Sequence, residues 1–357
     1  NCGSLFGVRV SVVVVTYRRG WSLPYSLGSL AAQSVKPDEV VVVLKPSGDN
    51  SEEVIESFRK KLPIRLLVQK EGNFTDALSI GIKESSGDII LFIDDDAVAE
   101  EKWVEKYVAL FQKLEDAGGI GGVTYYGELK DGRFIRTNEL VYTIVPTGKS
   151  LHVKPLPEYS DYCFWISIGG FTGESECKGE VFKSVRLPGT NMGFRREAIV
   201  DCPLGETFRK SRRGGLNEQF LAYCAKKKGY HTYQANSLVA PTAWHLRHSE
   251  SLSRKSDFWG EFWMHYDKAV FYWRIKRLGA SVSIWRYLLG LAVYLICDRP
   301  RYCWELIVRN RSGLYRRLND LGVLSAESRS KADLAKYAVM RITARFLASL
   351  YAVAVRA

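Results

Sequence analysis

The stretch "GDIILFIDDDAVAEEKW", residues 87–103, decides the fold prediction because an apolar run is followed at once by three adjacent carboxylates. Residues 88–94 have the apolar pattern of a buried strand. Asp94, Asp95 and Asp96 stand side by side where that strand ends. Burying one carboxylate without a partner costs several kcal/mol, roughly. The pattern therefore predicts a positive partner at the end of the strand, and a divalent cation is the obvious candidate.

Alternation of apolar runs and amphipathic stretches in the first third predicts an α/β fold. Three more strand-like runs precede the aspartates, at residues 8–17, 38–44 and 64–69. Helical patterns lie between the runs, at residues 22–33, 50–62 and 75–85, and Asn50 with Glu53 is a plausible capping pair. This order predicts a mostly parallel, doubly wound sheet flanked by helices, with its ligands at the C-terminal ends of the strands.

The middle of the chain predicts short mixed strands and loops, because residues 119–190 are rich in glycine and aromatic residues. No helix is predicted there. Helical patterns return at residues 195–200 and 216–229, and the second ends on lysines and Gly229, a good C-terminal stop. The sequence contains no internal repeat or low-complexity segment.

Positive charge belongs to the last third of the chain. Residues 1–250 contain 32 Lys and Arg against 31 Asp and Glu, whereas residues 251–357 contain 19 against 8. The cations there alternate with Trp, Tyr and Phe, and the longest uncharged apolar run, 287–297, is shorter than the ~18 residues of a membrane-spanning helix. The pattern predicts a domain over 1–248 and, over 249–357, amphipathic helices in a membrane interface on anionic lipid.

Cysteine content gives an expectation about the compartment. The seven cysteines contain no Cys-x-x-Cys pair, so the sequence supports neither a zinc ribbon nor a disulfide framework. We expect reduced thiols in the cytosol. The N-terminal residues lack the features of a secretory signal, so no export is expected.

Several motifs occur together in a familiar order: "VSVVVVTYRR", "GDIILFIDDDAVAEEKW", "LPGTNMGFRREAIV", "GLNEQFLAYCAKKKGY" and "AWH". In this order the chain resembles glycosyltransferase family 2, which has the GT-A fold, over roughly residues 8–248. The resemblance implies a nucleotide-sugar donor and a Mn²⁺ or Mg²⁺ ion held by Asp94 and Asp96, with Asp95 next to the nucleotide. Two carboxylates can reach one such cation through hard oxygens; the alternative is a loop cap or a solvated turn.

The resemblance also assigns the catalytic base. In the family an acidic pair lies eleven residues before the Gly of a Gly-Tyr pair, and its second member deprotonates the acceptor hydroxyl. That position is Glu218 here, with Asn217 in place of the first acid. The alternative is an ordinary glutamate at a helix N-terminus, stabilised by the helix dipole.

Further ligands follow from the same comparison. A histidine after the final strand often completes the metal site, which favours His245 and then His248, although a lone histidine can equally be a packing residue. The end of the first strand, Thr16, Tyr17 and Arg18, is expected beside the nucleotide.

One motif departs from the family. Asp-Asp-x-Ser, whose carboxylate recognises the base, is replaced by "LKPSGDNS", in which Lys45 and Ser47 take those positions and Asp49 is the nearest acid. The choice of nucleotide is therefore open. The remaining sugar or acceptor candidates are Thr190, Asn191, Asn217, Arg212 and Arg213.

Together these features predict a metal-dependent, inverting glycosyl transfer to a hydroxyl of a lipid-linked glycan at the cytosolic membrane face, by a peripheral or shallowly inserted protein. A phosphate acceptor such as a polyprenyl phosphate is already ionised and needs no base, so Glu218 favours a hydroxyl.

The first guess for the donor is GDP-mannose, from a narrower likeness to archaeal mannosyltransferases. A polyprenyl-phosphate transferase, an inactive scaffold and a nucleotidyl transferase are the alternatives. Binding of nucleic acid is disfavoured because the sheet half is neutral.

Overall fold

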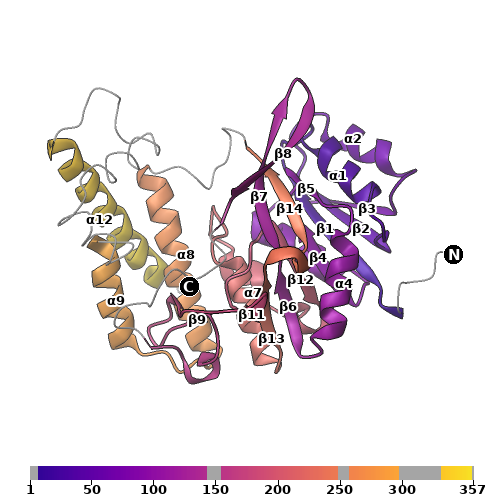
Figure 1. Cartoon of the computed structure of the whole chain (residues 1–357). Helices are drawn as coiled ribbons and strands as arrows, with labels where there is room; N and C mark the ends of the chain where they lie inside the picture. Colours follow the sequence, from indigo (N-terminus) through magenta and orange to yellow (C-terminus); the bar gives the residue numbers. More distant parts are fainter. Residues whose placement is uncertain (1–6, 143–153, 248–256, 297–330, 356–357) are drawn as a thin grey trace.

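The described residues form an eight-stranded sheet with flanking helices, a four-stranded sheet, a two-stranded sheet and a group of C-terminal helices (Figure 1). The computed structural model describes residues 7–142, 154–247, 257–296 and 331–355. The larger sheet has the strand order β11-β13-β6-β12-β4-β1-β2-β3. Its strands are β1 (Val10–Thr16), β2 (Glu39–Leu44), β3 (Ile64–Val68), β4 (Ile89–Ile93), β6 (Ala117–Gly121), β11 (Val181–Lys183), β12 (Asn191–Arg195) and β13 (His231–Ala235).

Most neighbouring strands of the larger sheet are parallel, as predicted. β1 lies between β2 and β4 and is parallel to both, β2 is parallel to β3, and β13 is parallel to β6. β12 runs antiparallel between β4 and β6, and β11 runs antiparallel to β13. β1, β2 and β4 are buried on both faces, which explains their near-continuous apolar runs. The α/β prediction is confirmed, and the C-terminal ends of β1, β2 and β4 meet at one edge.

Helices cover both faces of this sheet. On one side, α1 (Leu23–Ala31), α2 (Ser51–Phe58) and α4 (Trp103–Lys113) pack against Val12 and Val14. On the other side, α3 (Phe74–Glu84), α5 (Arg196–Ile199), α6 (Leu204–Phe208) and α7 (Asn217–Lys227) share a core with Val13. Successive valines of β1 thus enter different cores, as the two-residue period of a strand requires.

The predicted cap of α2 is wrong, and a capping box occurs one helix later. Asn50 precedes α2, but its side chain makes no capping hydrogen bond. Asn73 caps α3: its Oδ1 accepts hydrogen bonds from the N–H groups of Thr75 and Asp76, and Asp76 accepts one from the Asn73 N–H in return. The same Asn73 amide donates to the carbonyls of residues 208, 209 and 211, so it also fixes the chain after α6.

A smaller sheet completes the ligand-binding edge. Its order is β5-β14-β7-β8, from β5 (Ala97–Ala99), β7 (Val123–Lys130), β8 (Arg133–Leu140) and β14 (Thr242–Leu246). A further pair joins β9 (Phe164–Ile166) to β10 (Thr172–Glu174), and short 3₁₀ turns occur at Pro157–Tyr159 and Ser237–Val239. No α-helix occurs in the described part of residues 119–190, as predicted. Only residues 94–96 separate β4 of the large sheet from β5 of the small one.

The C-terminal helices are α8 (Phe258–Arg277), α9 (Ile284–Ile296) and α12 (Lys331–Ala354). The expectation that α8 lies in a membrane interface is wrong for most of its length, because it packs between α6 and α12 and buries residues such as Glu261 and Asp267. Apart from Trp259 at the start of α8, the exposed large apolar side chains of these helices are on α9 and α12. Among the described residues, no helix is long and apolar enough to cross a bilayer.

Two disulfides contradict the expectation of reduced thiols. Cys163 is bonded to Cys177 and Cys202 to Cys224, with Cα–Cα distances of 5.7 and 5.8 Å. Both distances lie in the range that a disulfide requires. The partners are 14 and 22 residues apart, so the pairing depends on loops and helices that spacing alone does not reveal.

Candidate metal and donor site at the end of β4

Two of the three aspartates form a compact ligand set with the predicted histidine. Oxygen atoms of Asp94 and Asp96 and a ring nitrogen of His245 all lie within 4.8 Å of one another. His245 Nε2 is 3.3 Å from Asp96 Oδ1 and 4.0 Å from Asp94 Oδ2. His245 Nδ1 contacts the carbonyl of Leu246 at 3.1 Å, which leaves Nε2 directed at the carboxylates. Oxygen and imidazole donors in this arrangement fit a Mn²⁺ or Mg²⁺ ion. His248 lies outside the described residues.

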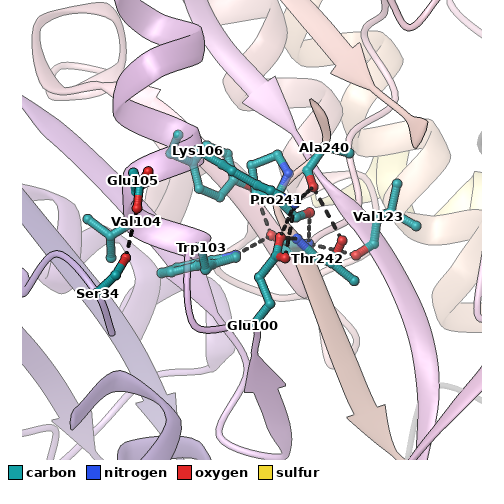
Figure 2. Close-up of polar contacts among 12 residues, drawn as sticks. Ser34, Glu100, Trp103, Val104, Glu105, Lys106, Val123, Ala240, Pro241 and Thr242 are labelled. Carbon is teal, nitrogen blue, oxygen red and sulfur yellow. Dashed lines mark hydrogen bonds and ion pairs between the residues drawn. The ribbon is translucent and has the colours of Figure 1, made fainter. Parts of the chain in front are cut away.

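The position of His245 follows from how β14 begins. Thr242, the first residue of β14, donates its N–H to Glu100 Oε1 at 2.7 Å (Figure 2). Lys106 neutralises Glu100 at 2.8 Å and also donates to the carbonyl of Ala240 at 3.1 Å. β14 then pairs with β5, and His245 stands opposite Ala97. The ion pair between Glu100, which follows β5, and Lys106 on α4 therefore fixes the strand three residues before the histidine.

Arg19 supplies the positive charge that the aspartates require. Its Nε lies 3.6 Å from Asp95 and 3.5 Å from Asp96. Burial, together with the charge of Asp96, nevertheless raises the pKa of Asp94, and it raises that of Asp95 well above the usual range. The cluster is thus short of positive charge, the condition in which a bound cation stabilises the site. Our sequence prediction named Arg18 and missed Arg19; the left-handed backbone at Arg18 (φ 58°) is not visible in the sequence.

The other predicted nucleotide residues divide into two groups. Thr16 is buried beside Asp95, where its hydroxyl lowers the carboxyl pKa, while Tyr17 is 42% exposed under the guanidinium of Arg18. These residues line the edge where the predicted donor would lie.

The loop after β2 is held by hydrogen bonds of its own. Lys45 donates to the carbonyl of Gly72 at 2.8 Å, and Ser47 donates to Asp49 at 2.8 Å. Burial raises the pKa of Asp49, but hydrogen bonds from Gly20 and Ser51 outweigh it and lower that pKa to about 2. Asp49 therefore ties the end of β1 to the start of α2, a use of the carboxylate in the fold itself.

Thr190 and Asn191 have different hydrogen-bond partners, although they are adjacent in the sequence. Thr190 Oγ1 donates to Asp94 Oδ2 at 2.8 Å, so it orients a predicted metal ligand. Asn191 is fully buried: its Oδ1 accepts from Trp103 and Tyr107, and its Nδ2 donates to two carbonyls of the small sheet's connections. Its amide is saturated by these four bonds. Asn191 thus joins the sheets and has no amide group left for a sugar.

Glu218 enters the same site from α7. Burial raises the pKa of Glu218 to about 7, the charge of Asp94 also raises it, and that of Arg186 opposes the shift. Its Oε2 is buried without a hydrogen-bond partner among the described residues. A Cβ placed on Gly189, next to Thr190, would lie 3.9 Å from the Glu218 carboxyl. A carboxylate with a pKa near neutrality in a desolvated position is suited to proton transfer at pH 7.

The loop before Glu218 is fixed by α8. Gly215 donates its N–H to Asp267 at 2.8 Å, and Arg213 donates to the carbonyl of Gly260 at 2.9 Å. Asn217 donates to the carbonyl of Gly214, and Leu216 has the left-handed φ of 64°.

Arg212, Arg213 and Asn217 were predicted to contact the sugar or the acceptor, and the structure places them in different surroundings. Arg213 and Asn217 hold the loop, whereas Arg212 is exposed over the ring of Trp263. Asp267 was missed because it lies about 50 residues further along the chain, on a helix whose pattern predicts membrane contact. Burial raises the pKa of Asp267 to about 7, against the hydrogen bonds from Ser211 and Gly215.

Comparison with known proteins decides the family. The sequence model described as "Glycosyl transferase family 2" matches residues 11–200, more than half of the chain. The chain belongs to glycosyl transferase family 2. The match runs from β1 through the aspartates to α5, so it includes both carboxylates of the candidate metal site.

Two curated proteins are similar to the chain. The glucosyl-dolichyl phosphate glucuronosyltransferase of Haloferax volcanii is 26% identical over 216 residues, 59% of this chain and 60% of that protein. The succinoglycan biosynthesis protein ExoM of Rhizobium meliloti is 24% identical over 263 residues, 69% of this chain and 80% of that protein. The chain thus spans less than two thirds of the length of the first relative.

Solved structures support the GT-A fold. The mannosyltransferase PcManGT from Pyrobaculum calidifontis, in complex with GDP-Man and Mn²⁺, superposes with a TM-score of 0.52 over 96% of this chain and 87% of its own. GalNAc-T7, with UDP, GalNAc and Mn²⁺, gives 0.51 over 82% and 58%. Their identities to this chain are 13% and 14%, so the likeness concerns the fold.

Proposed function

We propose that the protein transfers a hexose from a nucleotide-sugar donor to a hydroxyl of a lipid-linked glycan, with inversion at the anomeric carbon. The observation that carries the proposal is the approach of Glu218 to the ligand set of Asp94, Asp96 and His245 at one sheet edge. A base and a cation site on opposite sides of a reacting carbon are what an inverting transfer requires.

Asp94, Asp96 and His245 would hold the Mn²⁺ or Mg²⁺ ion. Bound there, the cation would neutralise the charge that develops on the leaving nucleoside diphosphate. Thr190 orients Asp94 by its hydrogen bond, and the guanidinium of Arg19 lies 3.6 Å from Asp95 and 3.5 Å from Asp96, where its charge partly offsets that of the carboxylates. Thr16, Tyr17 and Arg18 lie at the end of β1, where the nucleotide is proposed to bind.

Glu218 takes the proton of the acceptor hydroxyl as that oxygen attacks. Its pKa of about 7 leaves much of the carboxylate ionised at neutral pH while keeping it basic enough to accept a proton. Arg186 limits the rise of this pKa through its positive charge. A phosphate acceptor would make no use of such a base, which favours a hydroxyl acceptor.

A lipid-linked acceptor is proposed because the C-terminal helices present an apolar surface. Trp285 on α9 is 77% exposed, and Phe346 and Leu350 on α12 are each 51% exposed. The other exposed apolar side chains on these two helices are Leu288, Leu289, Val339, Ile342, Leu347, Tyr351 and Val353. Among the side chains described on α9 and α12, the exposed charged ones, Arg286 and Lys336, are both cations. This composition suits peripheral docking on an anionic bilayer.

The proposed location is the cytoplasmic face of the cell membrane, and GDP-mannose is the first donor to test. The dolichyl-phosphate glucuronosyltransferase of Haloferax volcanii, whose name states a lipid-phosphate substrate, supports the lipid-linked acceptor. The two disulfides are unusual in a reducing compartment, so counting free thiols in protein from cytosolic extract tests the location.

Donor hydrolysis and transfer test the proposal directly. UDP-, GDP- and dTDP-sugars are incubated with Mn²⁺ or EDTA, with and without a lipid-linked glycan. Metal-dependent turnover of one donor that is lost in Asp96→Ala, together with loss of transfer in Glu218→Gln, is expected. Undiminished transfer to polyprenyl phosphate by Glu218→Gln would instead identify a polyprenyl-phosphate transferase. Absence of binding and turnover with every donor would make the protein an inactive scaffold.

A further inference from the structure

A basic pocket lies outside the donor site, between α6, α8 and the end of α12. It has a volume of about 250 Å³. Its lining includes four cationic side chains and one carboxylate, with Tyr266 and Val355 as its largest apolar walls. The lining residues that carry charge are Glu206, Arg209, Lys210, Arg274 and Arg277. The excess of cations indicates a site for an anion.

One hydrogen-bond donor in the pocket wall lacks an acceptor. Arg274 pairs through Nη2 with Glu206 at 2.9 Å, and the Glu206 side chain is 59% exposed. Arg274 Nε is buried and has no hydrogen-bond partner among the described residues. A buried donor without an acceptor is costly, and a phosphate oxygen is the acceptor that a guanidinium prefers.

The wall that carries Arg209 and Lys210 is held in place. Asn73, which caps α3, donates to the carbonyls of residues 208, 209 and 211. Thr207 Oγ1 donates to the carbonyl of Pro203 at 2.6 Å. The backbone under the two cations is therefore ordered before any anion binds.

The pocket is next to the exposed apolar surface of α12 on one side, and α8 links it to the loop before Glu218 on the other. Val355, which lines it, follows the last turn of α12, whose outer side chains are apolar. Arg274 lies seven residues after Asp267 on α8, about 10 Å along the axis and on the same face of the helix. Asp267 holds Gly215, three residues before Glu218. An amphiphile bound here would place its chain on the apolar surface and its polar end towards the proposed base.

We propose that this pocket binds the phosphate or diphosphate of a lipid, and that it is the anchoring site for the carrier of the acceptor glycan. The proposal rests on the proposed function for the acceptor, and it adds the place where the phosphate is held. Guanidinium and ammonium groups supply charge-assisted hydrogen bonds to the phosphate, while α12 contacts the hydrocarbon.

Vesicle sedimentation tests the site without requiring catalysis. The full-length chain is mixed with phosphatidylcholine vesicles that contain either geranylgeranyl phosphate or enough phosphatidylserine for equal surface charge. We expect about tenfold tighter binding to the phosphate lipid, because a terminal phosphate offers more acceptor oxygens than a phosphodiester. We expect Arg209→Gln with Lys210→Gln to reduce this preference to near unity. Both side chains are exposed, so circular dichroism and Tm should be unchanged.

Lys336→Gln is the matched control, because it removes an exposed cation near the other end of α12, about 28 Å from Val355 along the helix. It should weaken binding to both vesicle types equally and keep the preference. Equal binding of the two vesicle types by the unmodified chain, or a preference that survives the double substitution, would overturn the proposal. Tight binding of inorganic pyrophosphate that the double substitution abolishes, without any vesicle preference, would assign the pocket to a free anion.

The vesicle assay and the transfer assay can succeed or fail independently of each other. Selective vesicle binding by a protein that turns over no donor would contradict the proposed function and leave the pocket standing. Transfer to a lipid-linked glycan without selective binding would contradict the pocket alone.

Discussion

Replacing Glu218 by Gln should make the protein more stable at the same time as it abolishes transfer. Burial raises the pKa of Glu218 from 4.5 to about 7, so the folded state holds a proton that the unfolded state has released between these two pH values. Unfolding free energy therefore falls as pH rises from about 4.5 to about 7, and the loss is complete above pH 7. A shift of about 2.5 pKa units corresponds to about 3 kcal/mol. Gln cannot ionise, so the unfolding free energy of the Glu218→Gln variant does not include this decrease.

The assay is urea unfolding in EDTA at several pH values, with the stability difference between variant and unmodified chain as the readout. Near pH 4.5 the two should be similar, since Glu218 is then protonated in the folded state and only half ionised in the unfolded state. By pH 8 the variant should be more stable by about 2–4 kcal/mol. Glu56→Gln is the control: Glu56 is exposed beside Arg59, which lowers its pKa, so no gain with rising pH is expected. A Glu218→Gln difference that stays constant from pH 4.5 to 8 would refute the reasoning.

Three further predictions concern the metal site, the α8–α12 interface and a disulfide. Mn²⁺ at a hundred times its Kd should stabilise the unmodified chain by about 2.7 kcal/mol and leave Asp96→Ala unchanged in a thermal shift assay; equal shifts in both would place the ion elsewhere. Glu261→Gln should cost about 3–5 kcal/mol in urea unfolding, because it leaves the buried guanidinium of Arg345 without its carboxylate; a cost below about 1 kcal/mol would contradict this. Cys202→Ser opens the 22-residue link to Cys224 and should cost about 3 kcal/mol, while no change in unfolding would show that the bond does not stabilise the fold.

Local sequence patterns were sufficient to predict the end of β4 and the candidate metal ligands that follow it. An apolar run that ends in Asp94 and Asp96 identifies a strand and the chemistry after it, and the resemblance to the family located His245 and Glu218. Asp94 directly follows β4, His245 is the penultimate residue of β14 and Glu218 is the second residue of α7, so their places depend mainly on where strands and helices begin and end. The structure places Asp94, Asp96 and His245 within 4.8 Å of one another, and the charge of Asp94 acts on Glu218, whereas the roles of these residues stay predictions.

Residues whose partners are distant in the sequence were not predicted. Arg19 reaches Asp96 only because the backbone reverses at Arg18, and Asp267 reaches Gly215 only because α8 returns to the transferase core. Asn191 looks like a ligand residue in its motif, but its place between two sheets turns the amide inward. Sequence periodicity predicts which face of a helix or strand is apolar, but it does not predict which distant helix or strand packs against that face.

One turn of α8 joins two parts of the molecule that are otherwise far apart. The carbonyl of Gly260 accepts a hydrogen bond from Arg213 in the loop before Glu218, while the next residue, Glu261, accepts two from Arg345 on α12. Consecutive residues of α8 therefore hold the loop and the C-terminal helix. If Glu218 is the base and α12 lies on a membrane, as proposed, a change in the tilt of α12 would be expected to alter the transfer rate through this one helical turn.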